Sequence, residues 1–357
     1  MNYDYSAGEQ ELREKVGSVF ATGVPGIDGL LEKAAGAAEL KEIVKSGYRL
    51  LAESYWKIAA GGKPPAFELA VAEIEASRHS LSFGLSILAT RITAGAVASS
   101  GAGGWRQGVA ERVRAGEFIG AVSAANPGEN MLTVQEKPDG SVVLDGEVKG
   151  LLNGPIADLL LVRDRRGSRV FFVPAGSEGL EIGPDLPDAW LGGVRVDPDH
   201  IMALEEGKDP VSAALDLGLA TACVGLSTRV FNGIKDYASS ATLGGRPLMS
   251  DQHVRYKLAE LLTQLQASEY LVYRTAWMMD AGDPEQPVLA KVAKVFCGEN
   301  AGSIASSATL LAGTRGIERG SLFERAVRDA FYLEISGTNS ADARANIADA
   351  LAARFAA

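Results

Sequence analysis

The last quarter of the chain contains the two adjoining runs that decide its fold, ERAVRDA at residues 324–330 and EISGTN at residues 334–339. The first run belongs to a helical pattern over about 318–335, and Ser-Gly-Thr at 336–338 marks a turn after it. Three longer helical patterns precede it, at 211–240, 250–280 and 285–312. Four helices of this length with short turns predict an antiparallel four-helix bundle.

The pattern upstream of the bundle changes to short β-type runs between about 116 and 205. Residues 131–136 and 141–144 flank the turn KPDG, and residues 159–162 and 169–173 flank a polar turn. Several strands at close spacing predict a small barrel or sandwich. Residues 9 to about 115 have helical spacing. We therefore predict an α+β chain with an N-terminal helical domain (1–115), a middle β domain (116–205) and a C-terminal helical bundle (206–357).

Composition excludes several classes of function. The chain has 357 residues, a net charge of −10 and two cysteines, so phosphate-backbone binding to nucleic acid is not expected. Cys223 and Cys297 lie in apolar helical contexts without ligand spacing, and no metal site is predicted. The N-terminus has no signal-peptide pattern, and no run of 18 apolar residues occurs. We expect a cytoplasmic protein without membrane insertion.

These patterns together resemble the acyl-CoA dehydrogenase family. The Arg-Asp-Ala helix and Gly-Thr turn resemble the C-terminal end of that family, and Asn153-Gly154 lies where the family has its Asn-Gly. Residues 244–248 with Gln252 resemble the family's connection between its first two bundle helices. The resemblance implies an oxidoreductase flavoprotein that uses FAD for α,β-dehydrogenation of an acyl thioester, on CoA or a carrier protein.

The expected proton-abstracting group is missing from its usual place. In the family a glutamate precedes the Gly-Thr, and Ser336 stands here instead. A serine hydroxyl cannot act as that base at neutral pH without a partner base. Some relatives carry the base on the first bundle helix, which places Leu215 at that position and Asp216 beside it. We predict Asp216 as the catalytic base, and we interpret Glu334 and Asp329 as structural carboxylates.

The expected FAD contacts are also depleted. In the aligned flavin loop, SAANPGEN at 123–130, Ser123 keeps a hydroxyl and Gly128 keeps the turn. Residues 150–152, Gly-Leu-Leu, replace the family's Trp-Ile-Thr, while Ala241 and Leu310 replace an arginine and a glutamine. Arg246 is placed to compensate, and Gly313 fits the family's glycine turn. The resemblance therefore implies FAD that is bound weakly or shared with a partner subunit.

Three functions remain open at this point. The chain is an acyl-thioester dehydrogenase, a degenerate non-catalytic subunit that pairs with an intact paralogue, or a non-redox acyl-thioester binding protein. The apolar content of the last 150 residues exceeds what one four-helix core can bury, so we expect a homo- or hetero-oligomer formed through the bundle.

Overall fold

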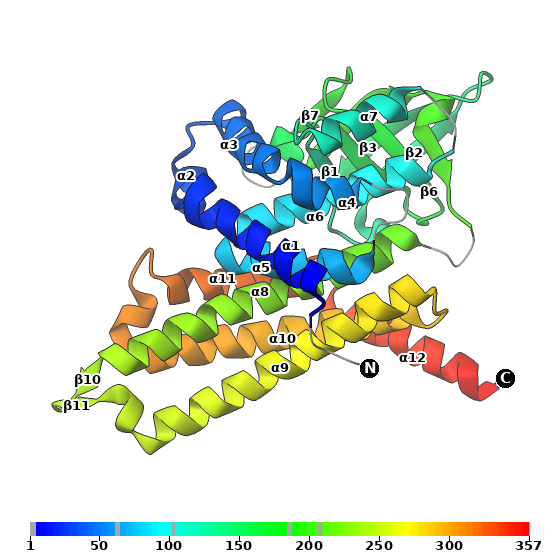
Figure 1. Ribbon diagram of the computed structural model, residues 1–357. Coiled ribbons are helices and arrows are strands. Elements are labelled where there is room, and N and C mark those ends of the chain that lie inside the picture. The colour runs from blue at the N-terminus through cyan, green and yellow to red at the C-terminus, as the bar shows by residue number, and fades with distance from the viewer. Residues whose placement is uncertain (1–4, 61–64, 102–103, 184–187, 206–208, 357) are drawn as a thin grey trace.

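The computed structural model describes residues 5–60, 65–101, 104–183, 188–205 and 209–356, and Figure 1 shows the β domain lying over the long C-terminal helices. The N-terminal elements are α1 (Ala7–Ser18), η1 (Val19–Gly23), α2 (Ile27–Lys33), α3 (Ala37–Leu50), η2 (Ala52–Trp56), α4 (Lys57–Ala59), α5 (Ala66–His79), α6 (Leu81–Ser99) and α7 (Trp105–Arg114). The predicted order of helical, β and helical regions is confirmed.

The β region consists of two sheets. Its strands are β1 (Gly120–Ser123), β2 (Met131–Glu136), β3 (Val142–Val148), β4 (Leu151–Leu152), β5 (Leu159–Arg163), β6 (Arg169–Pro174), β7 (Leu180–Ile182), β8 (Ala189–Val196) and β9 (Ile201–Ala203). One sheet has the order β4-β1-β5-β6-β9, with β1 parallel to β5, and the other has the order β2-β3-β8-β7. One apolar cluster joins Leu160 and Phe171 of the first sheet to Leu144 and Val194 of the second. The region is therefore a sandwich rather than a closed barrel.

The C-terminal region contains the four predicted helices and one more. They are α8 (Pro210–Ser240), α9 (Gln252–Ala281), α10 (Gln286–Ala312), α11 (Leu322–Ile335) and α12 (Ser340–Ala356), with the hairpin β10 (Thr242–Leu243) and β11 (Arg246–Pro247) between α8 and α9. The sequence analysis missed α12, which lies beyond the Ser-Gly-Thr turn at the end of α11.

Helices α5 and α6 pack directly on this bundle. A Cβ at Gly225 of α8 would lie 2.6 Å from the carbonyl oxygen of Ile74 on α5, so the two helices touch through their backbones. Asp280 at the end of α9 accepts hydrogen bonds from the backbone nitrogens of Ala66 (2.6 Å) and Phe67 (3.0 Å), which caps the first turn of α5. One hydrophobic core consequently extends from α1 to α11.

Two of these helices, α6 and α8, are long and apolar enough to span a membrane by length and composition. In this fold 78% and 83% of their most apolar windows are buried inside the protein. Burial against α5, the sandwich and the other bundle helices accounts for their apolar character.

Candidate active site

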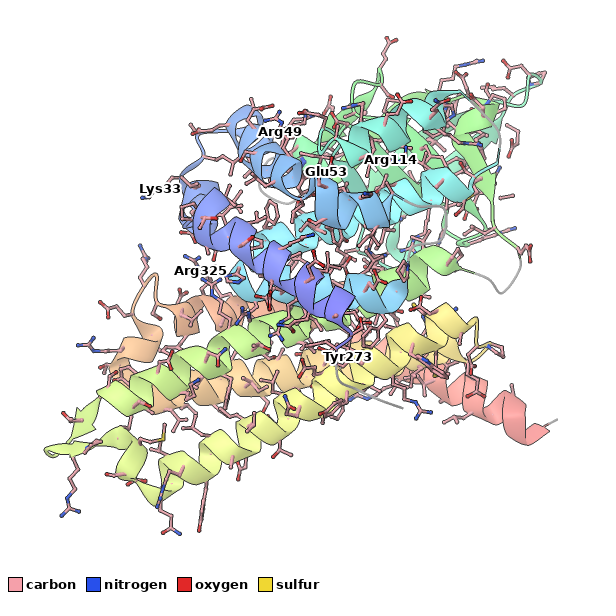
Figure 2. The ribbon with its side chains drawn as sticks, viewed as in Figure 1. Lys33, Arg49, Glu53, Arg114, Tyr273 and Arg325 are labelled. Carbon is pink, nitrogen blue, oxygen red and sulfur yellow. The ribbon has the colours of Figure 1, made fainter. Side chains whose placement is uncertain are left out.

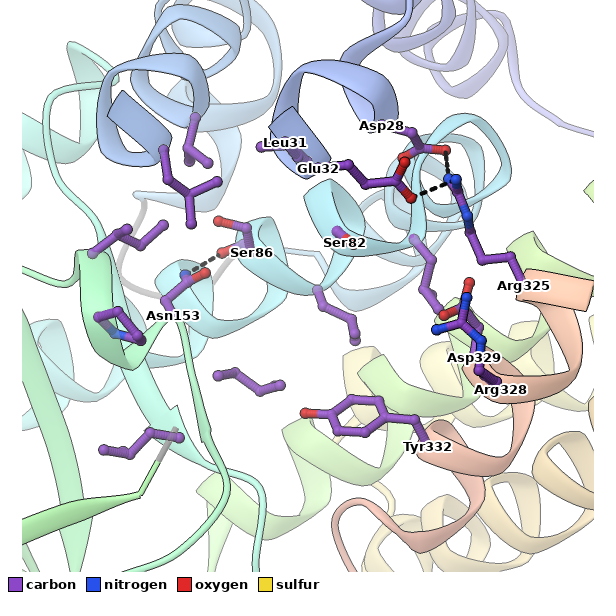
Figure 3. A pocket seen from close by; sticks show the side chains of 18 of the residues that line it. Asp28, Leu31, Glu32, Ser82, Ser86, Asn153, Arg325, Arg328, Asp329 and Tyr332 are labelled. Carbon is purple, nitrogen blue, oxygen red and sulfur yellow. Dashed lines mark hydrogen bonds and ion pairs between the residues drawn. The ribbon is translucent and has the colours of Figure 1, made fainter. Parts of the chain in front are cut away.

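A cleft of about 530 Å³ lies between α2, α3, α6, the segment after β4, and α11. Its wall is aliphatic and includes Leu31, Leu40, Leu81, Leu85, Leu151 and Ile156. Figure 3 shows the opposite end lined by charged side chains of α2 and α11. An apolar cleft with a few polar groups at one end is the usual form of a small-molecule site.

Asn153 shapes the floor of this cleft. It has φ 66°, the one positive value among the described residues other than glycine. Its side-chain amide donates to the carbonyl oxygens of Ser86 and Gly120, both at 3.0 Å, and these bonds hold the left-handed backbone in place. In the sequence, Asn153 was noted only because it resembles a family motif. Its left-handed conformation could not be predicted, because it depends on partners in α6 and β1.

The charged end of the cleft contains a chain of ion pairs. Asp28 accepts a bond from Arg229 at 2.6 Å and lies 3.7 Å from Arg325, which also pairs with Glu32. Figure 2 shows Arg325 at the junction of the N-terminal helices and the C-terminal helices. These pairs tie α2 to α8 and α11, so this end of the cleft is held by side chains of three elements.

Asp329 lines the same end of the cleft but stays outside these pairs. No hydrogen bond or ion pair joins its carboxylate to any other described residue, and burial raises its pKa to about 6. Its neighbour Arg328 donates instead to Glu324, at 2.9 Å. The carboxylate of Asp329 therefore borders the cleft, and our interpretation of it as a structural carboxylate stays a prediction.

Asp216 lies at the centre of the junction between α8, α10 and the Ser-Gly-Thr turn. Its side chain is 1% exposed. Oδ2 accepts from Lys291 Nζ at 3.1 Å and from Thr338 Oγ1 at 3.3 Å. Oδ1 is buried without a partner in the described part of the chain, and it lies 3.6 Å from the position that a Cβ would take at Gly337. The unpartnered oxygen thus lies beside the turn.

The turn itself has a defined conformation. Gly337 has φ 72°, and its backbone nitrogen donates to the carbonyl oxygen of Ala124 in the segment after β1. Ser336 donates its hydroxyl to the carbonyl oxygen of Tyr332 at 2.7 Å, so it completes the end of α11. The structure therefore brings Asp216, the turn and the segment after β1 together. The hydroxyl of Ser336 is occupied by its hydrogen bond to the backbone.

Two neighbouring buried groups set the electrostatics beneath the turn. Lys294 is 1% exposed and donates to the carbonyl oxygen of Glu334 at 2.5 Å, and burial lowers its pKa. Burial raises the pKa of the Cys223 thiol to about 12, so this cysteine stays protonated at neutral pH. The side chain of Glu334 packs near Gly298 and Gly302 of α10. Lys294 stabilises the C-terminal end of α11 as a cation at a helix C-terminus.

A second pocket of about 730 Å³ borders this junction. Its lining is polar and includes Asn126, Ser168, Asp209, Ser212, Lys291 and Thr338. The nearby Arg163 is 2% exposed in its side chain and donates to Asp209 at 3.1 Å and to Ser212 at 2.5 Å. Lys291 and Thr338 line this pocket and also hydrogen-bond to Asp216. They therefore connect the second pocket to Asp216.

The predicted cofactor residues are only partly brought together. Ser123 is buried in β1 and donates to the carbonyl oxygen of Lys149 at 2.8 Å, and Gly128 lies exposed in η3 (Pro127–Glu129). Arg246 is exposed in β11 and Gly313 is exposed at the start of η7 (Gly313–Ile317). Figure 1 shows the β10–β11 hairpin at the far end of the bundle from β1. Within one chain Arg246 is remote from Ser123.

Lys291 and Thr338 were missed by the sequence analysis. No local motif marks Lys291, because its contact with Asp216 depends on how α10 packs against α8. Within the described residues no three His, Cys, Asp or Glu side chains are placed to hold a metal ion.

Comparison with known proteins shows which enzymes this chain is similar to. A model described as the acyl-CoA dehydrogenase C-terminal domain matches residues 217–352. Benzylmalonyl-CoA dehydrogenase of Aromatoleum aromaticum is 26% identical over 63% of this chain and 66% of its own length, and L-prolyl-[peptidyl-carrier protein] dehydrogenase of Pseudomonas fluorescens is 26% identical over 66% and 69%. The structure of butyryl-CoA dehydrogenase from Megasphaera elsdenii has a TM-score of 0.86 at 18% identity, over 98% of this chain and all of that one. The C-terminal region thus matches the acyl-CoA dehydrogenase C-terminal domain, the whole chain has the fold of butyryl-CoA dehydrogenase, and its alignments span about two thirds of these curated relatives.

Proposed function

We propose that this chain is the subunit of an FAD-dependent dehydrogenase that removes an α- and a β-hydrogen from an acyl thioester, with Asp216 as the base. The observation that carries the proposal is the buried, unpartnered Oδ1 of Asp216 beside the Ser336–Thr338 turn. A carboxylate free on one oxygen and fixed on the other is suited to accept a proton at a defined position. The relatives' names describe enzymes, which favours neither a degenerate subunit nor a non-redox binding protein.

The cations of the polar pocket fit the phosphates of FAD. Arg166 and Lys291 supply two cations there. The amide of Asn126 and the hydroxyls of Ser168 and Ser212 donate to Asp342, Asp164 and Asp209 within the protein. Arg166 and Lys291 would therefore hold the cofactor's phosphates. When bound, FAD would supply the acceptor for the β-hydride. Gly150 offers no side chain on the flavin-facing segment, so we propose that FAD is held with fewer contacts than in the relatives.

The chain's own residues then have distinct tasks. The aliphatic wall of the cleft binds the acyl part and excludes water, which strengthens the interactions of the polar groups inside. Lys291 and Thr338 fix Oδ2 of Asp216, so Oδ1 takes the α-proton. Gly337 lets the turn lie against Asp216, since any side chain there would meet Leu219 at 2.5 Å.

The test is substrate-dependent reduction of FAD in an anaerobic spectrophotometer, with a panel of acyl-CoA and acyl-carrier thioesters. Wild type reconstituted with FAD should lose its flavin absorbance on mixing, and Asp216→Asn should slow this step roughly 10²- to 10⁴-fold. Glu334→Gln is the matched control, because this carboxylate packs against α10, and its rate should be unchanged. A silent Asp216→Asn in an active preparation would refute the assignment of the base.

A further inference from the structure

The charged end of the cleft leaves one acidic group without a partner. Three arginines and three carboxylates line it, and Arg229, Arg325, Asp28 and Glu32 are engaged with one another. The remaining arginine, Arg328, is 67% exposed in its side chain and pairs with Glu324 outside the cleft. Asp329 is left with no direct partner among the described residues, and it borders the space that a ligand would fill (Figure 3).

A ligand that fills the cleft changes the surroundings of this carboxylate. Asp329 is half-buried, so water still reaches it when the cleft is open. An apolar ligand would displace that water and leave an ionised carboxylate without a hydrogen bond, which is unfavourable. A ligand that carries an N–H group at this position would replace the lost water with a charge-assisted hydrogen bond.

We propose that the Asp329 end of the cleft is a subsite for an N–H donor of the thioester ligand, either an ammonium group on the acyl part or an amide of the pantetheine arm. This inference rests on the proposed function and names the polar group that the substrate must present. Arg325 and Arg328 on α11, Arg229 on α8 and the acids of α2 surround Asp329. The positive and negative side chains around Asp329 are nearly equal in number, so their charges largely cancel. The subsite therefore selects a ligand by its hydrogen-bond donor and not by its net charge.

The test uses two unreactive thioethers of equal size, S-hexylpantetheine and S-(5-aminopentyl)pantetheine, with binding measured by calorimetry at pH 7.5. We expect wild type to bind at least one of them and Asp329→Asn to bind that probe about 10-fold or more weakly. Glu334→Gln on the same helix is the control and should bind as wild type does. A loss confined to the aminopentyl probe assigns the donor to the acyl part, and an equal loss for both assigns it to the pantetheine amides.

Two outcomes separate this inference from the proposed function. If wild type binds neither probe, the thioester site itself is wrong and the subsite is refuted with it. If wild type binds and Asp329→Asn binds equally well or better, only the subsite is refuted. A second measurement needs only wild type and so does not depend on whether the variant folds. Because Asp329 ionises near pH 6, the affinity for the donor-bearing probe should rise as the pH increases through about 6. A flat profile between pH 5 and 8 would overturn the proposal.

Discussion

Ser336, which the resemblance places where the family has its base, hydrogen-bonds to the backbone at the end of α11. Its hydroxyl donates to the carbonyl oxygen of Tyr332, and its nitrogen donates to the same oxygen at 3.0 Å. Ser336→Ala should therefore cost about 0.5–1.5 kcal/mol of stability and leave the rate of thioester oxidation within about twofold. Thermal unfolding and flavin reduction together check this. Loss of turnover in a folded Ser336→Ala protein would show that Ser336 takes part in catalysis.

Glu75 provides a residue-scale test of pH dependence. Burial alone would raise its pKa, but hydrogen bonds from His79, Arg78 and Arg13 outweigh burial and lower the pKa to about 2. Since the folded pKa lies below the unfolded value near 4.5, the stabilisation is present above pH 4.5 and is lost as the pH falls toward 2. Urea unfolding of Glu75→Gln and wild type should differ by roughly 1–3 kcal/mol at pH 7 and much less at pH 3. Parallel curves at both pH values would contradict this assignment.

Single residues were harder to predict when their contacts lie far away in the sequence. Asp216 could be proposed as the base from the sequence because the resemblance places Leu215 at a base position of the first bundle helix and Asp216 next to it, and this assignment stays a prediction. Its partners Lys291 and Thr338 could not be predicted, since they lie 75 and 122 residues away in the chain. The position of Asp329 at the cleft could not be predicted, because a helix pattern does not tell which polar side chain faces a cleft and which faces a neighbour.

Close backbone packing between α5 and α8 is an element-scale feature with a direct test. A Cβ at Gly225 would lie 2.6 Å from the carbonyl oxygen of Ile74 and 2.9 Å from the nitrogen of Arg78. Backbone atoms cannot yield cheaply, so Gly225→Ala should destabilise the protein by about 1–3 kcal/mol. Denaturant midpoints measure the effect.

Gly95 is the matched control for that substitution. It lies within α6, and a Cβ there would meet nothing within 4 Å. Gly95→Ala should raise stability by up to about 1 kcal/mol through helix propensity alone. If both alanine variants shift the midpoint in the same direction, close packing at Gly225 is not the cause.

Element prediction succeeded where periodicity was strong. The helices α8 to α10 begin and end within about two residues of their predicted bounds, because long apolar faces mark them. The helix α12 was missed because its apolar residues are mostly alanine and show little periodicity. The choice between barrel and sandwich could not be made, since strand spacing does not determine which strands pair.

Assembly belongs to the scale of the whole molecule. Tyr256, Tyr270 and Trp277 are exposed on α9, and Phe296 and Leu310 are exposed on α10. Large apolar side chains on two bundle helices are typical of an interface with a second subunit. We predict a dimer or tetramer in sedimentation equilibrium at micromolar concentration. A stable monomer there would contradict the prediction, and Trp277→Lys should weaken the assembly.

Cofactor content is a second whole-molecule prediction. The β10–β11 hairpin, which carries Arg246, lies in Figure 1 at the far end of the bundle from β1, which carries Ser123, so one chain alone does not gather the predicted contacts. We expect less than one FAD per chain after gel filtration of the protein purified alone, measured from the ratio of flavin to protein absorbance. Co-purification with a related subunit should raise that ratio. One tightly held FAD in the isolated chain would contradict the expected weak binding.

The residue that caps α5, Asp280, is synthesised long after α5 itself. The acceptor lies 214 residues after the nitrogen of Ala66. At about 5–20 residues per second, the ribosome delivers it roughly 10–40 s after the helix has emerged. During that interval the apolar faces of α5 and α6 lack the helices that cover them. A nascent chain stalled near residue 205 should therefore recruit chaperones, and release of the full-length chain should end that dependence.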